Sequence, residues 1–464
     1  MEIRHPDITG DDNKLIQVLL KVWRDKRSRN WLRNRYYEGK NHVRNLGITL
    51  PPELASFSNV HLGWGAKAVD ELAVRSRFDG FVYKGIDDPL VDTLRANNFF
   101  DLYRQATISE LTNSCAFVTI GAGAEGEPPV ILNAYAATQA AATWNAREKR
   151  ISAGLVITKI PKEYGVEASD PTAFTVYTDD TVIECEKGTS SWDVRKTENI
   201  YGRPLMEALV YNPSLTKPFG TSRISRAAMS IIDRAMRCAL RMDIAGEFFS
   251  APQRYLLGAE EGVLDGRSKW EAYIYNIFAV SKDEEGDMPK YGQLPQMQLT
   301  PLTEQMRALA AEFSGETSIP ISSLGIIHDN PASAEGIHAA REDLILEAES
   351  LNTTNGNALK NIGLLALAIL GGYPSIEAMP DEWKTITPKF KNPARPSVVS
   401  QSDAMVKQVA AIPEIGQTTV ALEELGYTAD QIMRMKAEWV GAAARNTFRE
   451  IAEEMSAQAE AVVS

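Results

Sequence analysis

The sequence predicts an α+β protein that is mainly helical and contains one β-rich segment. Apolar residues recur at helical spacing near the N-terminus and again beyond residue 220, whereas residues 115–210 hold short β-like runs separated by turn formers. The chain has 464 residues with 44% hydrophobic content. At about 100–200 residues per domain, this is enough for roughly two to four folded units.

The charge and the cysteines exclude several classes of protein. A formal net charge of −12 argues against a dedicated nucleic-acid binder, which usually has a basic excess. Cys115, Cys185 and Cys238 are widely separated, so we expect no disulfide framework and a cytosolic chain. The longest apolar stretch, 362–370, is far shorter than the ~20 residues of a membrane span, and the N-terminus lacks an export signal.

Two helices are predicted before residue 80. The first covers about residues 13–45, with its apolar residues at helical spacing, and ends near residues 36–39. Its basic run at 24–29 is typical of a solvated helix face. The second covers residues 60–76, and we expect Trp64 in it to pack into a core.

The β-rich segment follows, with predicted strands at residues 116–120, 154–157, 173–177 and 181–184. The glycine-rich residues 121–126 lack the spacing and the following helix of a dinucleotide loop, so we predict a tight hairpin. Asp179 and Asp180 point to opposite faces of an extended chain, which favours a turn over a metal site.

The next helix, about residues 221–251, carries a basic stripe opposite an apolar arc. At about 100° per residue the stripe spans roughly 80° around the axis. Its members are Arg223, Arg226, Arg234, Arg237 and Arg241. The apolar arc consists of Ile224, Ala228, Ile231, Ile232, Ala235, Ala239 and Met242.

Residues 252–300 form a predicted insert, which begins where Pro252 disfavours helical geometry in the residue before it. At about fifty residues it is small for independent stability. Its aromatic residues are too many for it to bury alone, and aromatic residues are enriched in interface cores. These candidate interface residues are Trp270, Tyr273, Tyr275 and Phe278.

A second helix near residues 302–316, a loop at 319–332 and a third helix from Ser333 come next. Pro320 and Pro331 bracket the loop, and Gly325 gives it a flexible point. Either the loop is an ordinary connector or it is a moving functional element. We expect the third helix to break at residues 355–356, an Asn-Gly pair.

Several stretches resemble the portal proteins of long-tailed (siphovirus-type) double-stranded DNA bacteriophages. They occur in the same order over most of the chain, and the specificity comes from their combination. They are Trp64 with residues 69–73 (VDELA), residues 220–225 (GTSRIS), 247–255 (EFFSAPQRY), 330–337 (NPASAEGI), 392–397 (NPARPS) and 402–404 (SDA).

The resemblance implies a portal fold: a helical protein with a β-rich wing, two stem helices, a small α/β clip, a long wing helix and a helical crown. Each part has a place in this chain. The implied parts are residues 1–220 (wing), 221–251 (first stem helix), 252–300 (clip), 301–318 (second stem helix), 319–332 (tunnel loop), 333–394 (long wing helix and connection) and 395–464 (crown).

The resemblance also implies a function and partners. A portal is a ring, usually of twelve copies, at one capsid vertex of the virion, and it assembles in the host cytoplasm. It conducts double-stranded DNA without sequence specificity during packaging by the terminase large subunit and during ejection. It contacts the major capsid protein and a head-tail adaptor, and no membrane.

Roles for individual residues follow from the same resemblance. The clip aromatic residues are expected between subunits, and the stem arginines either line the channel, bridge to acids of a neighbour or face solvent. The channel or tunnel loop takes the polar residues Ser322, Ser323, Gly325, His328, Asp329 and Asn330.

Enzymatic functions find little support in the residues. The five histidines form no H-E-x-x-H motif, and no G-x-x-x-x-G-K-[ST] phosphate loop occurs. We therefore expect no catalytic, cofactor or metal site. Two alternatives remain open, another structural head component such as a minor capsid or adaptor protein, and an intracellular hydrolase.

Overall fold

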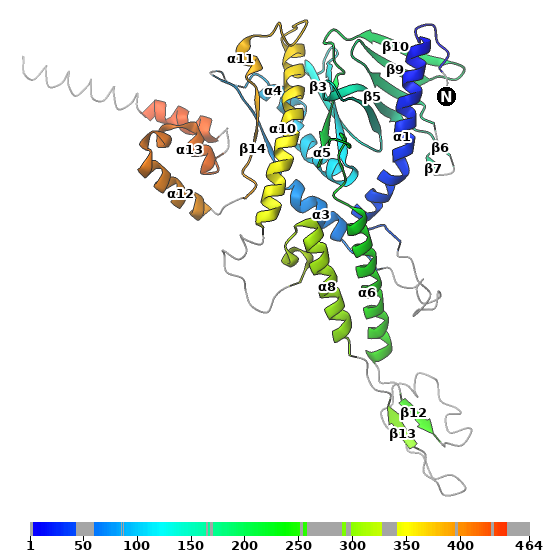
Figure 1. Ribbon diagram of the computed structural model, residues 1–464. Coiled ribbons are helices and arrows are strands. Elements are labelled where there is room, and N and C mark those ends of the chain that lie inside the picture. Colours follow the sequence, from blue (N-terminus) through cyan, green and yellow to red (C-terminus); the bar gives the residue numbers. More distant parts are fainter. Residues whose placement is uncertain are drawn as a thin grey trace, which may run out of the picture. The chain divides into compact units, whose positions relative to one another are not determined.

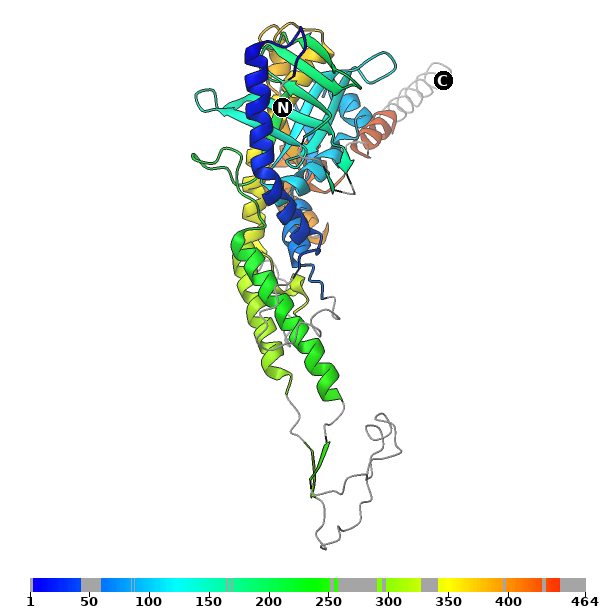
Figure 2. The ribbon, with the colours of Figure 1, turned by 90° about the vertical axis from the view of Figure 1, so that its right-hand side faces the viewer.

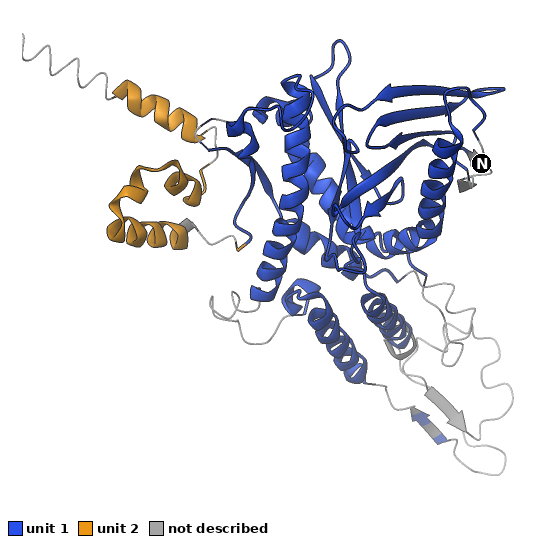
Figure 3. Ribbon diagram, turned by 45° about the horizontal axis from the view of Figure 1, so that its top comes forward, with its two compact units in different colours: residues 1–393 blue, residues 394–464 orange. Residues whose placement is uncertain are grey.

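The computed structural model describes residues 3–42, 60–84, 86, 88–163, 166–167, 170–250, 254–257, 290–293, 298–326, 341–394, 398–427 and 431–442. The chain divides into two compact units, residues 1–393 and 394–464 (Figure 3). This division lies one residue before the expected start of the crown.

Two antiparallel sheets form the centre of the first unit. The larger has the strand order β10-β9-β8-β5-β4 and the smaller β11-β2-β3. The larger sheet comprises β4 (Ala140–Asn145), β5 (Arg150–Lys159), β8 (Ala173–Tyr177), β9 (Thr181–Lys187) and β10 (Trp192–Glu198). The smaller comprises β2 (Cys115–Ala122), β3 (Val130–Ala136) and β11 (Met206–Val210), and the short pair β6 (Lys162–Glu163) and β7 (Val166–Glu167) lies apart.

Side chains alternate over most of β4 and β5, which stacks these sheets between helices. Ala141 and Leu155 belong to the core shared with helix α1 (Gly10–Tyr37), while their neighbours Ala142 and Val156 belong to the core that contains Phe117 of the smaller sheet. Successive side chains of a strand point to opposite faces, so each sheet serves two apolar layers. The order of layers is α1, the larger sheet, the smaller sheet and then a helical layer (Figure 1).

That helical layer covers the outer face of the smaller sheet. Its residues join Val118, Ile120 and Leu209 in one core. The elements are β1 (Phe78–Val82), α4 (Val91–Ala96), α5 (Phe99–Asn113), α10 (Glu342–Leu370), α11 (Asp381–Lys384) and β14 (Thr387–Phe390), the last paired antiparallel with β1.

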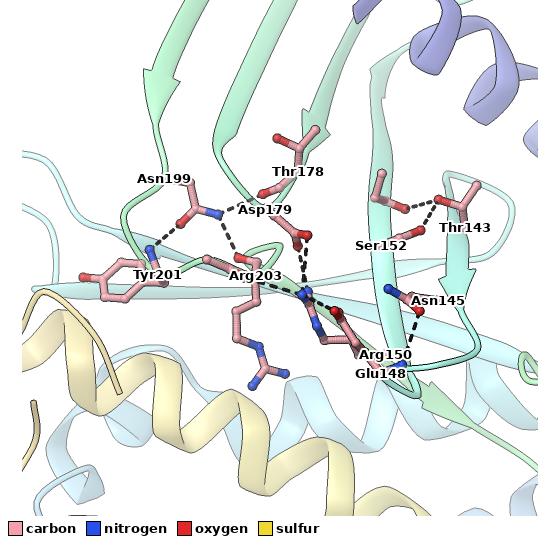
Figure 4. Close-up of polar contacts among 12 residues, drawn as sticks. Thr143, Asn145, Glu148, Arg150, Ser152, Thr178, Asp179, Asn199, Tyr201 and Arg203 are labelled. Atoms are coloured by element: carbon pink, nitrogen blue, oxygen red, sulfur yellow. Dashed lines mark hydrogen bonds and ion pairs between the residues drawn. The ribbon is translucent and has the colours of Figure 1, made fainter. Parts of the chain in front are cut away.

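A polar cluster holds the crossover from the larger to the smaller sheet. Figure 4 shows the Arg150 guanidinium between the carboxylates of Glu148 and Asp179, at 2.6 and 2.7 Å. Asn199 donates to the carbonyls of Thr178 and Arg203, which ties the crossover to the turn between β8 and β9. Asp179 thus lies in the predicted turn, where its carboxylate forms an ion pair with Arg150.

Two long helices leave this layered body. Helices α6 (Arg226–Ser250) and α8 (Thr300–Thr317) lie side by side in both Figure 1 and Figure 2. Both helices share a core with α3 (Trp64–Ala73), and the centre of the Trp64 ring lies 5.2 Å from that of Phe313 in α8. The chain between them includes β12 (Arg254–Leu257) and β13 (Lys290–Gln293), paired antiparallel.

Helix α10 belongs to two cores at once. Leu344, Ala348 and Leu351 belong to the core that α3, α6 and α8 share, whereas Leu359 and Ile362 belong to the core of the smaller sheet. The helix continues through residues 355–356 to Leu370, so the predicted break there is wrong. Asn355 is fully buried and hydrogen-bonded, which compensates for its poor helix propensity.

The second unit is described by itself. It contains α12 (Val398–Ala411), the 3₁₀ turn η2 (Pro413–Gln417), α13 (Thr419–Glu424) and a helical stretch at residues 431–442. Few of its described apolar side chains are buried; Met405, Ala421 and Ile432 are the main ones. Val399, Val406 and Trp439 are exposed.

The other predictions compare well with these elements. The solvated basic face of α1, the core position of Trp64 and the four predicted strands are confirmed. A hairpin does form at the predicted place, since β2 and β3 pair antiparallel with Ala122 opposite Val130, but its loop covers residues 123–129 and is longer than the tight hairpin predicted. The prediction omitted the other strands, which are β1, β3, β4, β6, β7, β10, β11, β12, β13 and β14.

Candidate functional site

Helices α6 and α8 form an antiparallel pair with a defined register. Ser225 donates a hydrogen bond to Glu316 at 2.6 Å, Arg234 pairs with Glu312 at 2.8 Å, and Cys238 lies 3.3 Å from the Leu302 carbonyl. The apolar arc predicted on α6 faces this partner: Ile231, Ile232 and Ala235 are buried. Helix α6 thus has one face that packs against α8 and one face that is exposed to solvent.

Four of the five arginines predicted for the basic stripe lie on helix α6. Arg226 and Arg234 are exposed, while Arg237 and Arg241 are half-buried on the helix. Arg223 does not belong to the stripe. The helix begins only at Arg226, because the Ser225 hydroxyl accepts the Ala228 N–H at 3.0 Å in the manner of an N-cap.

Arg223 is instead a buried clamp at the base of the helix pair. Its side chain is 3% exposed. The guanidinium donates to the Ala68 carbonyl of α3, the Thr317 carbonyl of α8, the Tyr211 hydroxyl and the Glu347 carboxylate of α10. Because four segments meet on one cation, we infer that Arg223 fixes the junction between the helix pair and the layered body. Ser225, a preferred N-cap residue, was the sequence signal that placed it outside the helix.

A second polar contact secures the same junction. The Tyr36 hydroxyl donates to both carboxylate oxygens of Asp233 at 2.9 Å, and Asn41 donates to Asp233 at 3.3 Å. Burial, reinforced by Asp233, raises the pKa of Tyr36, so the phenol remains a donor at physiological pH. This pair joins the end of α1 to α6.

We expect the exposed ion pair on the helix pair to contribute little to stability. Arg234→Ala removes the contact with Glu312, but both side chains are nearly half exposed. Exposed pairs contribute about 0–1 kcal/mol, so the unfolding free energy should fall by less than about 1 kcal/mol and the loss should shrink at high salt. Denaturant unfolding at low and high salt measures it. A loss well above 1 kcal/mol would contradict this reading.

The described part of the predicted tunnel loop has a fixed start. Ile319 is buried, and its carbonyl accepts the Ser314 hydroxyl at 2.6 Å. Ser322 and Ser323 lie in the 3₁₀ turn η1 (Ile321–Leu324), and Gly325 ends it with a φ of +84°. Both serines are partly or fully accessible.

Other predicted site residues lie outside the described residues. They are His328, Asp329 and Asn330 of the loop, the cap Ser333, and Trp270, Tyr273, Tyr275 and Phe278 of the insert.

A buried acid that the sequence analysis missed lies between α5 and α10. Glu110 is 0% exposed and accepts a hydrogen bond from Asn355 at 2.9 Å, and Asn355 also donates to the Tyr103 hydroxyl at 3.2 Å. The Tyr103 hydroxyl lies 2.8 Å from that of Ser76. Burial raises the pKa of Glu110 to about 8. No local sequence pattern marks this group, since its partner is far along the chain.

Over the described ranges, no three His, Cys, Asp or Glu side chains are grouped so that they could hold a metal ion. None of the helices in the described part combines the length and the apolar character needed to cross a membrane.

Comparison with known proteins places these elements in a family. The family model for phage portal proteins of the SPP1 Gp6-like type matches residues 16–444. The portal protein of Mycobacterium phage D29 is 25% identical over 452 residues, covering 94% of this chain and 89% of its own. The portal protein of Mycobacterium phage L5 is 25% identical over 417 residues, covering 86% and 83%.

Two solved structures of gene transfer agents (GTA) are also similar. A chain from the neck of the empty GTA particle, computed with C6 symmetry, has a TM-score of 0.47 and 12% identity and covers 82% of this chain and 90% of its own. One from the neck of the native particle, computed with C12 symmetry, has a TM-score of 0.43 and 13% identity and covers 78% and 89%. The match of the family model to residues 16–444 shows that the chain belongs to the SPP1 Gp6-like family of phage portal proteins.

Proposed function

We propose that this chain forms the portal ring at one capsid vertex of a bacteriophage. The ring is the conduit for double-stranded DNA during packaging and ejection, and it docks the terminase motor and then the head-tail connector. The observation that carries this proposal is the family match, which extends from α1 into the second unit. A ring of identical chains, usually twelve, builds a central channel from one repeated surface.

The geometry supports an assignment of the parts of a portal subunit to the parts of this chain. The layered body corresponds to the wing, and α6 with α8 corresponds to the stem. The chain leaves the stem through β12 and returns through β13, as an inserted clip would. Residues 319–332 correspond to the tunnel loop and the second unit to the crown.

The charge of the chain suits a conduit. Each phosphate that a Lys or Arg neutralises adds affinity for DNA, and high affinity would retard sliding. A net charge of −12, with Arg234 already paired to Glu312, keeps such contacts few. We assign the chain no catalytic role, so the packaging motor supplies ATP hydrolysis. The portal ring acts in the virion, after it has assembled with the capsid protein in the host cytoplasm.

Electron microscopy of the purified protein tests the ring directly. A ring with a central hole wide enough for duplex DNA is expected. A monomer of 51.1 kDa that stays monomeric when capsid protein is added would instead favour another structural head component.

We expect the tunnel loop to act on DNA rather than on assembly. Deleting residues 325–329 should leave rings intact in micrographs, because the described contacts of Ile319 with α8 lie outside the deletion. Packaged DNA per head should fall, since the loop no longer narrows the channel. Nuclease-protected DNA in heads assembled with wild-type or deleted portal measures this. Full packaging and normal DNA retention would show that the loop is only a connector.

A further inference from the structure

A cavity of about 340 Å³ lies within the wing, at α1, the start of β2, β4 and residues 216–221. Its floor is apolar, because Cys115, Phe117, Ala140 and Ala142 are buried there. The cavity is separate from the stem and from the loop discussed above. Nothing in the portal function proposed above requires it.

All the charged side chains that line this cavity are positive. Lys26, Arg29 and Arg33 fall within about 60° of one another on α1, and Lys217 lines the cavity from the segment 216–221. No Asp or Glu lines the cavity. Within the described part of the chain, none of the four cations forms an ion pair. In a chain of net charge −12, such a concentration of uncompensated cations indicates an anionic ligand.

Two polar groups inside the cavity refine the chemistry of that ligand. Arg33 is half-buried and donates to the Asn113 carbonyl at 3.2 Å, and burial together with Arg29 lowers the pKa of its guanidinium to about 10. The side-chain oxygen of Asn113, a residue 3% exposed, has no hydrogen-bond partner in the described chain. A buried acceptor requires a donor, so the ligand should carry N–H groups beside its anionic group.

The cavity wall formed by residues 216–221 is held in place by aromatic contacts and by its backbone geometry. The Phe219 ring lies 6.0 Å from Phe117 and 5.8 Å from Trp144, which anchors the wall formed by residues 216–221. Gly220 has a φ of +68°, and a Cβ on it would lie 2.1 Å from the Tyr211 carbonyl oxygen. This wall therefore needs little reorganisation on binding, which favours affinity.

We propose that this cavity binds an acidic peptide segment of a partner protein. A carboxylate lies among Arg29, Arg33 and Lys217, a peptide N–H donates to Asn113, and an apolar neighbour rests on the alanine floor. Peptides supply both the anion and the donor, whereas a phosphodiester supplies acceptors only. A rigid duplex also presents its phosphates on its outer surface and cannot bring one down to the half-buried Arg33.

Fluorescence polarisation of the full-length protein tests the proposal. The probe is a short fluorescein-labelled peptide rich in glutamate with one central phenylalanine, and its matched control has glutamine in place of glutamate. The glutamate peptide should bind and the glutamine peptide should not. Arg33→Gln and Arg29→Gln should each weaken binding about tenfold or more, as the loss of a charge-assisted hydrogen bond does.

The control variant is Arg35→Gln, which makes the same charge change about 180° around α1 from Lys26. It should bind the peptide as the wild type does. Ring formation of each variant is checked by electron microscopy, so that failure of assembly is distinguished from loss of the peptide. If Arg33→Gln does not fold, Lys217→Gln decides, because that side chain is exposed.

Three results would overturn the proposal. The first is equal binding of the glutamate and glutamine peptides, and the second is undiminished binding by a folded Arg33→Gln or, failing that, by Lys217→Gln. The third is displacement of the peptide by inorganic phosphate or by duplex DNA at comparable concentration, which would assign the cavity to phosphate.

Discussion

Arg223→Ala should lower the unfolding free energy of this protein by about 3–5 kcal/mol, the usual cost of removing one partner of a buried ion pair. The substitution leaves the Glu347 carboxylate without its cation and removes the donors to the carbonyls of Ala68 and Thr317. Those groups lie where α3, α8 and α10 meet, so the helix pair should loosen from the wing.

Denaturant unfolding followed by tryptophan fluorescence measures this effect, since Trp64 lies in the same core. Arg234→Ala serves as the matched control, because it removes an arginine of the same helix pair from an exposed contact. Pairing Arg223→Met with Glu347→Gln should recover part of the loss, because no unpaired buried charge then remains. If Arg223→Ala were as mild as the control, the clamp would not hold the junction.

Glu110→Gln should stabilise the protein at alkaline pH and change little under acid conditions. Burial raises the pKa of Glu110 from 4.5 to about 8 in the folded chain. At pH 9 the wild type must keep a charge in an apolar core, which at about 1.4 kcal/mol per pKa unit costs up to roughly 4–5 kcal/mol. Glutamine avoids that charge and can still accept the hydrogen bond from Asn355.

The sign of the pH dependence follows from proton binding. Between pH 4.5 and about 8 the folded state keeps a proton on Glu110 that the unfolded state has lost, so wild-type stability falls as the pH rises through this range. The unfolding midpoints of the wild type and of Glu110→Gln should therefore be similar at pH 4 and clearly different at pH 9, where the variant is more stable. Glu349→Gln, an exposed change on α10, should show no such divergence. Parallel pH profiles for wild type and Glu110→Gln would refute the prediction.

The sequence predicted what depends on local periodicity. The apolar arc of α6 was correct because a helix of 3.6 residues per turn requires it, and the strands at β2, β5, β8 and β9 are rich in β-branched residues. Strand β4 was missed because half of its residues are alanine, which favours strands weakly, whereas β3 was missed although it contains Val130, Ile131 and Tyr135.

The features that escaped prediction depend on distant partners. Asn355 reads locally as a helix breaker, but Glu110 and Tyr103, more than two hundred residues earlier, accept hydrogen bonds from its amide nitrogen. Gly356 also faces distant residues, since a Cβ on it would lie 3.4 Å from Pro388 and 3.6 Å from Phe390. The clamp of Arg223 with Glu347 likewise joins residues 124 positions apart, and no pattern within a helical window could reveal it.

The double membership of α10 has an evolutionary consequence. Leu344, Ala348 and Leu351 are set in one core and Leu359 and Ile362 in another, with Asn355 fully buried between them. Inserting or deleting one residue between Asn352 and Gly356 would rotate one half of the helix by about 100° against the other. The apolar side chains on one side of the change would then point away from the core in which they are buried. Among homologues, this segment should therefore vary in composition but hold its length, while gaps collect in the surrounding loops.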